Sequence, residues 1–296
     1  MRLVVPAALV VLGLSACDPE RAEETTVEEF RFEAGPERPR IEIRIEEGSI
    51  EIEGVESSRA IEGDFLKRAR SVDRETARGL LARIEVSALE SEDGARIRFE
   101  GRVESIPPFG GDLRTDLRLR VPREVDLDIA TEDGRIQIEG VDGSVRAESG
   151  DGRIFAGRVS GELRLRTEDG SIAGRDLDAR VEAATGDGNI ELDGTFTRIE
   201  AVTSDGSIRI DCLDWREPSE GWVLRTADGA IRVLLPASAA ADIDATASGG
   251  RIVNRLASFD GAGSKQSDGR LRGKIGGGGP LLFFSTMDGR IELSQK

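Results

Sequence analysis

The sequence contains no histidine and no tyrosine, and it has only two cysteines. Without histidine the chain lacks the usual acid–base catalyst near neutral pH and the commonest metal ligand. A Ser-His-Asp or Cys-His nucleophile is therefore excluded, and so is a zinc site built from histidine and cysteine. We expect a protein that is not an enzyme and that has no cofactor.

Aromatic residues make up only 4% of the chain, whereas glycine occurs 36 times. A wide globular core of this size would need large aromatic side chains, but a narrow core filled by aliphatic residues would not. The formal net charge is −16. Nucleic acid binding depends on clustered basic residues, so this charge argues against it. The same charge argues against adhesion of the protein surface to anionic lipid.

The amino-terminal segment predicts export. Residues 1–16 contain one positive charge, at Arg2, followed by an apolar run that is too short to span a membrane. The sequence Leu-Ser-Ala-Cys that ends at Cys17 resembles a bacterial lipobox, which implies cleavage before Cys17 and its lipidation. The alternative is a secreted protein with an unrelated cysteine there. Several acyl chains would give a lasting membrane anchor.

Residues 17–40 are acidic and rich in proline, which favours a lipid anchor followed by a tether. Alternation of apolar and charged residues in Thr26–Ala34 allows the first strand to begin within it. Once Cys17 is lipidated, Cys212 has no partner for a disulfide. It is either a reactive thiol or a small residue at the end of a strand.

An Asp-Gly pair recurs every eighteen residues in the middle of the chain, and a fixed period of this kind indicates stacked structural repeats. The strictly spaced pairs are Asp133-Gly134, Asp151-Gly152, Asp169-Gly170, Asp187-Gly188 and Asp205-Gly206. Looser spacing follows at Asp228-Gly229, Gly249-Gly250, Asp268-Gly269 and Asp288-Gly289. We expect each pair to form a tight turn in which glycine takes a positive φ.

Two residues after each Asp-Gly pair stands an aliphatic residue, as in Ile154, Ile172 and Ile190. Around these positions apolar and polar residues alternate, which is typical of strands with one buried face. We therefore predict an all-β fold, a β-solenoid of about 18-residue coils, and favour right-handed coiling. Its regular coils occupy residues 133–296, and the carboxyl end shows no obvious cap.

Residues 41–132 are also rich in strands and continue the same domain, with one helix that could cap the solenoid. Ser71 or Asp73 can cap this helix, and its apolar face contains Ala77, Leu80, Leu81 and Ile84. Residues 217–221 lengthen one coil, which indicates either a functional loop or drift in the repeat.

These features together resemble the DUF4097 family of putative adhesins with a β-strand repeat. The resemblance covers about Val27 to Leu293 and includes the strand pair at 41–52, the helix, and the repeated Thr-x-Asp-Gly-x-Ile turns. It implies a β-solenoid in the cell envelope and implies no catalytic residues.

Stacked turns would place the repeated aspartates in a row, where neighbouring carboxylates repel each other. Either Ca²⁺ lies between them, or each carboxylate accepts backbone N–H bonds in its own turn, helped by nearby arginines. Two residues before most of these aspartates stands a threonine, and these threonines would form a second row: Thr131, Thr167, Thr185, Thr203, Thr226 and Thr286. They bind glycan hydroxyls or water, or they bond across neighbouring coils.

Three functions are compatible with the sequence. The first is a non-catalytic, lipid-anchored scaffold of the bacterial cell envelope, on the periplasmic side of a membrane or at the surface, that binds a protein or glycan. The second is a structural element that self-associates end to end. The third is a polysaccharide-active enzyme with paired aspartates, which the short coils and the scarcity of aromatic residues disfavour.

Overall fold

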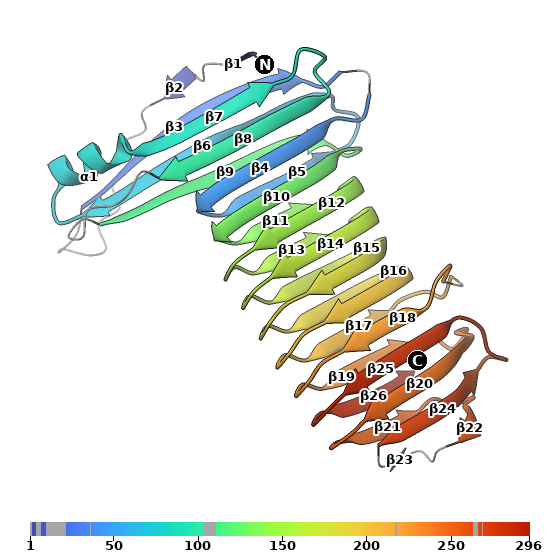
Figure 1. Ribbon diagram of the computed structural model, residues 1–296. Helices are drawn as coiled ribbons and strands as arrows, with labels where there is room; N and C mark the ends of the chain where they lie inside the picture. Colours follow the sequence, from blue (N-terminus) through green and yellow to red (C-terminus); the bar gives the residue numbers. More distant parts are fainter. Residues whose placement is uncertain are drawn as a thin grey trace. The chain divides into compact units, whose positions relative to one another are not determined.

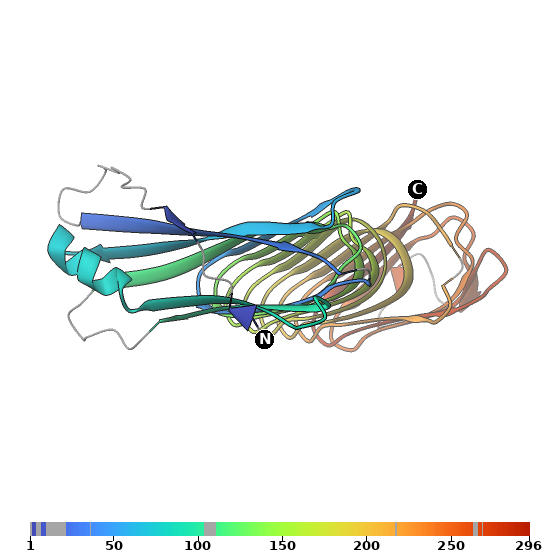
Figure 2. The ribbon, with the colours of Figure 1, turned by 90° about the horizontal axis from the view of Figure 1, so that it is seen from above.

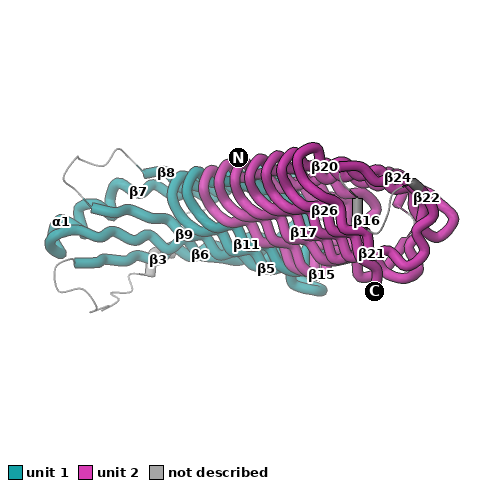
Figure 3. The backbone as a smooth tube through the Cα atoms, turned by 90° about the horizontal axis from the view of Figure 1, so that it is seen from below, with its two compact units in different colours: residues 1–149 teal, residues 150–296 magenta. Residues whose placement is uncertain are grey.

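The computed structural model describes residues 2–3, 7–9, 22–35, 37–103, 111–216, 218–262, 266–267 and 269–296. Strands make up 65% of the structure and helix only 3%, which confirms the all-β prediction. The chain forms two compact units, Met1–Ser149 and Gly150–Lys296 (Figure 3).

Unit 1 contains twelve described strands and one helix (Figure 1). They are β1 (Arg2–Leu3), β2 (Ala7–Leu9), β3 (Ala22–Glu33), β4 (Arg40–Glu47), β5 (Ile50–Val55), β6 (Ala60–Ser71), α1 (Arg74–Leu81), β7 (Ile84–Glu90), β8 (Arg96–Val103), β9 (Asp112–Pro122), β10 (Asp126–Asp133), β11 (Ile136–Glu139) and β12 (Asp142–Ser149). Strand β3 lies inside residues 17–40, where we expected the tether.

The strands of unit 1 form two layers. One runs β12–β10–β4–β8–β7–β1 and the other β11–β5–β9–β6–β3–β2. In the first layer the strands pair in parallel from β12 to β8, and β8, β7 and β1 pair antiparallel. In the second layer they pair in parallel from β11 to β9, and β9, β6, β3 and β2 pair antiparallel. The order in space therefore differs from the order in sequence, because β4 lies between β10 and β8 and β5 between β11 and β9.

Aromatic residues fill unit 1 between its long strands. Phe30, Phe65 and Phe99 are buried, with ring centroids 4.7 to 6.2 Å apart. Helix α1 lies at the end of the long strands (Figure 2), and its Ala77 and Leu80 are buried. Asp73 caps the helix by accepting a hydrogen bond of 2.8 Å from the Thr76 N–H, which lowers the pKa of the Asp73 carboxyl.

Unit 2 contains fourteen described strands. They are β13 (Ile154–Gly157), β14 (Ser160–Thr167), β15 (Ile172–Ala184), β16 (Ile190–Val202), β17 (Ile208–Cys212), β18 (Trp222–Arg225), β19 (Ile231–Leu235), β20 (Ala241–Ala247), β21 (Arg251–Arg255), β22 (Asp260–Ala262), β23 (Gln266–Ser267), β24 (Arg270–Ile275), β25 (Leu281–Thr286) and β26 (Arg290–Gln295).

From β13 to β17 the strands pair in parallel, and paired residues are eighteen positions apart except near a bulge in β15. Ile154 lies opposite Ile172, which lies opposite Ile190, and Leu163 lies opposite Val181 in the facing layer. The three isoleucines are at most 1% exposed. Burial of each side chain contributes about 1.5–3 kcal/mol, so stacked coils share one aliphatic core. The predicted inward positions are thus buried.

The last coil departs from sequence order. Strands β25 and β26, at the end of the chain, lie between β18/β19 and β20/β21 (Figure 1). Ile231 therefore lies opposite Ile291, which lies opposite Ile252. Strands β22 to β24 then pair antiparallel beyond β20 and β21. These strands cap the carboxyl end, so the prediction of an uncapped end was wrong.

Candidate functional site

The threonine row in unit 2 is part of the framework. Each hydroxyl lies within hydrogen-bond distance of two carbonyls of the coil before it in space, and the N–H of the Asp-Gly glycine donates to it. For Thr203, the Gly186 and Gly188 carbonyls lie at 2.9 and 3.0 Å and the Gly206 N–H at 3.3 Å. The same pattern includes Thr167, Thr185, Thr203, Thr226 and Thr286. These hydroxyls bond across coils, as one of the two sequence alternatives predicted.

We expect Thr203→Val to lower the free energy of unfolding by about 1–3 kcal/mol, because it leaves buried backbone groups without partners. Thr197→Val is the matched control. Thr197 is half-buried on strand β16, and among the described residues its hydroxyl makes no hydrogen bond. Urea unfolding followed by tryptophan fluorescence measures both. Equal effects of the two substitutions would contradict the role of the Thr203 hydroxyl.

The glycines of the repeated turns are required for a different reason from the one predicted. Of the Asp-Gly glycines in the described chain, Gly269 has a positive φ, of 92°, whereas Gly170, Gly188 and Gly206 do not. A Cβ on Gly188 would lie 1.9 Å from the Gly170 carbonyl oxygen. Glycine is needed because consecutive turns stack backbone against backbone.

The aspartates of these turns lie at the surface. Asp169, Asp187 and Asp205 are exposed, and within the described chain no hydrogen bond or ion pair reaches their carboxylates. The prediction that each carboxylate accepts backbone bonds in its own turn was wrong for these three. Among the described residues, no group of three or more His, Cys, Asp or Glu side chains is placed to hold a metal ion. Asp268 lies outside the described residues.

One of the two cysteines, Cys212, lies in the described part of the chain. Cys17, the predicted lipidation site, lies outside the described residues. Cys212 ends strand β17 and is 1% exposed. Burial raises the pKa of its thiol to about 11, so little thiolate is present near neutral pH.

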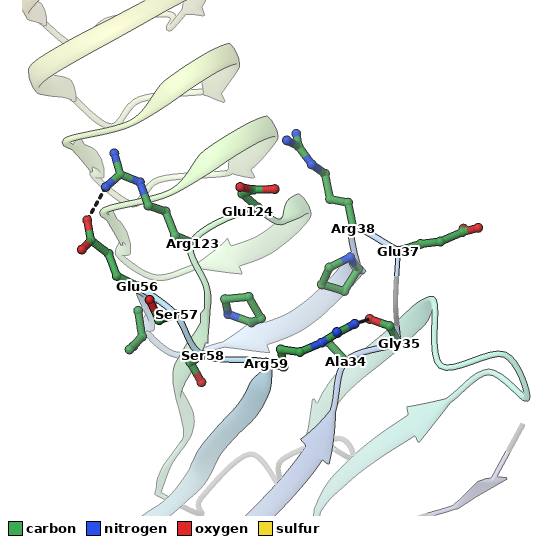
Figure 4. A pocket seen from close by; sticks show the side chains of 13 residues that line it. Ala34, Gly35, Glu37, Arg38, Glu56, Ser57, Ser58, Arg59, Arg123 and Glu124 are labelled. Atoms are coloured by element: carbon green, nitrogen blue, oxygen red, sulfur yellow. Dashed lines mark hydrogen bonds and ion pairs between the residues drawn. The ribbon is translucent and has the colours of Figure 1, made fainter.

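A cavity of about 500 Å³ lies in unit 1 where three connections meet (Figure 4). They are the β3–β4 connection, the β5–β6 turn and the segment after β9. Its charged and hydroxyl groups belong to Glu37, Arg38, Glu56, Ser57, Ser58, Arg59, Arg123 and Glu124. No motif in the sequence marks these residues, because they come together only through strand pairing.

Several of these side chains are held in place. The Arg59 guanidinium donates to the Gly35 carbonyl, and Arg123 Nη1 lies 2.6 Å from Glu56 Oε1 (Figure 4). Ser57 has a left-handed backbone with φ 57°. Within the described chain, the carboxylates of Glu37 and Glu124 make no hydrogen bond or ion pair. The cavity thus offers hydrogen-bond donors and acceptors of both charges and no aromatic face, which suits a polar ligand.

A smaller hollow of about 240 Å³ lies on the β13–β15–β16–β17 layer of unit 2. Phe155 and Ala173 line it together with Arg175, Arg209, Glu191, Asp193 and Asp211. The carboxylate of Asp193 accepts a 2.7 Å hydrogen bond from the Asp176 N–H, whose residue has φ 52°. This carboxylate supports a bend of strand β15, so we treat this hollow as secondary.

The loop after β17 is fastened to the neighbouring layer. Glu220 pairs with both Arg180 and Arg198, and these partners lower the pKa of its carboxyl. Arg216 makes two hydrogen bonds of 2.9 Å with the Asp178 carboxylate. Ion pairs fix the described residues of this loop, and these residues line neither the unit 1 cavity nor the hollow on the β13–β15–β16–β17 layer. This favours an irregularity of the repeat over a functional loop.

Among known proteins, solved structures resemble this chain. No family model matches the chain, and no curated protein matches it. A lipid binding protein from Parabacteroides distasonis, named putative, is 14% identical, with a TM-score of 0.45, and the match covers 91% of this chain and 95% of that one.

Two proteins named putative adhesins also match. One is from Bacteroides fragilis, at 11% identity with a TM-score of 0.43, and the match covers 90% of this chain and 96% of that one. The other is from Parabacteroides merdae, at 8% identity with a TM-score of 0.42, and covers 90% and 95%. In the described part of this chain, no helix has the length and apolar character needed to cross a membrane.

Proposed function

We propose that this protein is a non-catalytic, lipid-anchored binding protein of the bacterial cell envelope and resembles the DUF4097 family. Its framework is a right-handed β-solenoid, and its lipid is carried by Cys17. The observation that carries the binding role is the cavity in unit 1, where three connections from distant parts of the sequence present charged and hydroxyl groups. Its partner is a polar segment of a protein or glycan.

The distribution of fixed polar groups supports this assignment. In unit 2, the threonine hydroxyls and turn glycines are used to stack the coils, and most arginines of the β14–β15–β16 layer lie in ion pairs. The cavity instead combines held side chains, such as Arg59 and Arg123, with the unpaired carboxylates of Glu37 and Glu124. A site of this kind needs little reorganisation to bind, which favours affinity.

The anchor is tested by metabolic labelling with a palmitate analogue in a bacterial host. The wild-type protein is expected to take up the label and to remain with the membranes after high-salt washing. Cys17→Ala should take up no label and lose that retention. Label on the Cys17→Ala variant would contradict the anchor.

The binding role is tested with the purified protein on arrays of envelope glycans and peptides. We expect Arg59→Ala, Arg123→Ala or Glu124→Gln to weaken any selected ligand at least tenfold. The control is Arg164→Ala, which removes a surface arginine paired with Glu162 and Glu182 in unit 2. A ligand that is cut or released as a product would contradict the non-catalytic assignment. An equal loss of affinity in the cavity variants and in Arg164→Ala would contradict the assignment of binding to the cavity.

A structural role by end-to-end association is less well supported. Strands β22 and β23, at the outer side of the carboxyl end, are three and two residues long. Short edge strands limit pairing with another chain. Sedimentation at rising concentration checks this, and we expect a monomer throughout.

A further inference from the structure

The distance between the predicted anchor and the first long strand is short. Strand β3 begins at Ala22, five residues after Cys17. Five residues span at most about 18 Å even when fully extended. If Cys17 is lipidated, as the proposed function requires, the start of β3 must lie close to the bilayer surface.

The start of β3 belongs to the helix end of unit 1. Ala22 lies opposite Ser71, the last residue of β6, and α1 follows directly. Glu24, near the start of β3, is only 4% exposed, and Arg74 and Arg78 of α1 lie 3.7 and 3.3 Å from its carboxylate. These ion pairs connect α1 to the beginning of strand β3, the first long strand after Cys17.

The surface of this end fits a layer of phospholipid headgroups. Val72 is 76% exposed, and the side chains of Arg74 and Arg78 are 60% and 62% exposed. Arginine can lie along an apolar surface while its guanidinium contacts phosphate. Although the whole chain has a charge of −16, the stretch 67–83 contains six basic and two acidic residues.

The acidic groups facing this stretch are largely engaged. Asp73 caps α1, Glu24 lies beneath the helix, and Glu23 pairs with Arg70 at 2.5 Å. Farther along β6, Lys67 and Arg68 pair with Glu28 and Asp116. The exposed surface at this end therefore includes Val72, which precedes α1, and the exposed parts of the Arg74 and Arg78 side chains, with Glu75 as the remaining acidic group of the first turn.

We propose that the α1 end of unit 1 is a membrane-docking surface, in which Val72, Arg74 and Arg78 contact phospholipid headgroups and hold the protein beside its lipid anchor. This inference rests on the proposed lipidation of Cys17. It places the cavity of unit 1 at the other end of β6, because the eleven steps from Ala60 to Ser71 extend about 36 Å. The cavity then faces away from the bilayer.

The test uses the mature, lipidated protein in vesicles of phosphatidylcholine and phosphatidylglycerol that contain a lipid with a nitroxide headgroup. A fluorophore is attached at Val72→Cys or, as the control at the opposite end of β6, at Glu56→Cys. The native Cys212 is buried and does not compete for the label, and Cys17 is blocked by its lipid. We expect headgroup quenching of the Val72→Cys label to be at least three times that of the Glu56→Cys label at 50 mM salt, and the difference to fall by half at 500 mM.

A difference that is absent, reversed or insensitive to salt overturns the proposal. Arg74→Gln in the Val72→Cys background should reduce the quenching at least twofold, while Arg78 still pairs with Glu24 and keeps the helix in place. Arg164→Gln is expected to leave it unchanged. Failure of the lipidation is recognised separately, because the protein then does not float with the vesicles and the mass of its amino-terminal peptide shows no acyl chains.

Discussion

A chain that ends at Pro280 is expected to lose the cooperative folding of unit 2. The missing residues form β25 and β26, which pair with β18 and β19 on one side and with β20 and β21 on the other. Their loss removes a coil from the interior of the stack and exposes strand edges on both sides of the gap.

The size of the effect follows from four side chains. Leu282, Phe284, Ile291 and Leu293 are fully buried. At about 1.5–3 kcal/mol each, their burial contributes about 6–12 kcal/mol, which is comparable to the whole stability of a typical domain. The two tryptophans of the chain, Trp215 and Trp222, both lie in unit 2, so their fluorescence reports on this unit alone. We expect the truncated chain to show an unfolded emission maximum without denaturant.

Two neighbouring phenylalanines provide the matched point substitutions. Phe284 is buried, whereas Phe283 points to the other face of β25, where the Arg225 guanidinium lies 5.4 Å from its ring centroid. Phe284→Ala should lower the free energy of unfolding by about 3–5 kcal/mol, and Phe283→Ala by about 1 kcal/mol or less. A synthetic peptide of residues 281–296 should restore folded fluorescence to the truncated chain. Native-like fluorescence of that chain alone would contradict the interior position of the last coil.

The sequence predicts which side chains point inward far better than which coils are neighbours. Period-two alternation identifies the buried face of each strand, and Ile154, Ile172 and Ile190 are buried as expected. Every coil presents an aliphatic residue at the same place, however, so any coil can stack on any other. The pattern alone therefore cannot reveal that Ile291 lies between Ile231 and Ile252.

A similar limit applies to Leu271. It fits the repeat by sequence and is fully buried, yet it lies on the antiparallel strand β24, opposite Ala245. A buried strand has the same alternation whether its neighbour runs parallel or antiparallel. The direction is decided by the connections, such as the four glycines from Gly276 to Gly279, which all have positive φ. The tight reversal that they permit brings the chain back into the stack.

The cavity of unit 1 was not predictable from local patterns. Its residues lie in three short connections that contain no shared motif, and they meet only because β4 and β5 pair with β10 and β11 across a long insertion. The threonine row, in contrast, was visible in the sequence, and bonding across coils was one of the two roles that the sequence allowed. A feature that recurs in every coil can be recognised in a single sequence. A site that occurs once, such as the cavity, can be recognised only when the order of the strands is known.

Gly188→Ala is expected to destabilise unit 2 strongly. The new Cβ would lie 1.9 Å from the Gly170 carbonyl oxygen and 2.9 Å from the Thr185 hydroxyl. The obstacle is backbone of the next coil, which cannot rotate away as a side chain can. Separating the two turns would also lengthen the hydrogen bond from the Thr185 hydroxyl to the Gly170 carbonyl. We expect the free energy of unfolding to fall by about 3 kcal/mol or more.

Gly79→Ala provides the control, since it adds the same methyl group where no atom lies within 4 Å. Gly79 lies inside α1, where alanine is favoured over glycine by about 0.5–1 kcal/mol. The control is therefore expected to leave the protein unchanged or slightly more stable. Thermal unfolding followed by circular dichroism compares the two variants with the parent protein. If Gly188→Ala unfolded at the same temperature as Gly79→Ala, the turns of neighbouring coils could not be in backbone contact, and the requirement for glycine would need another cause.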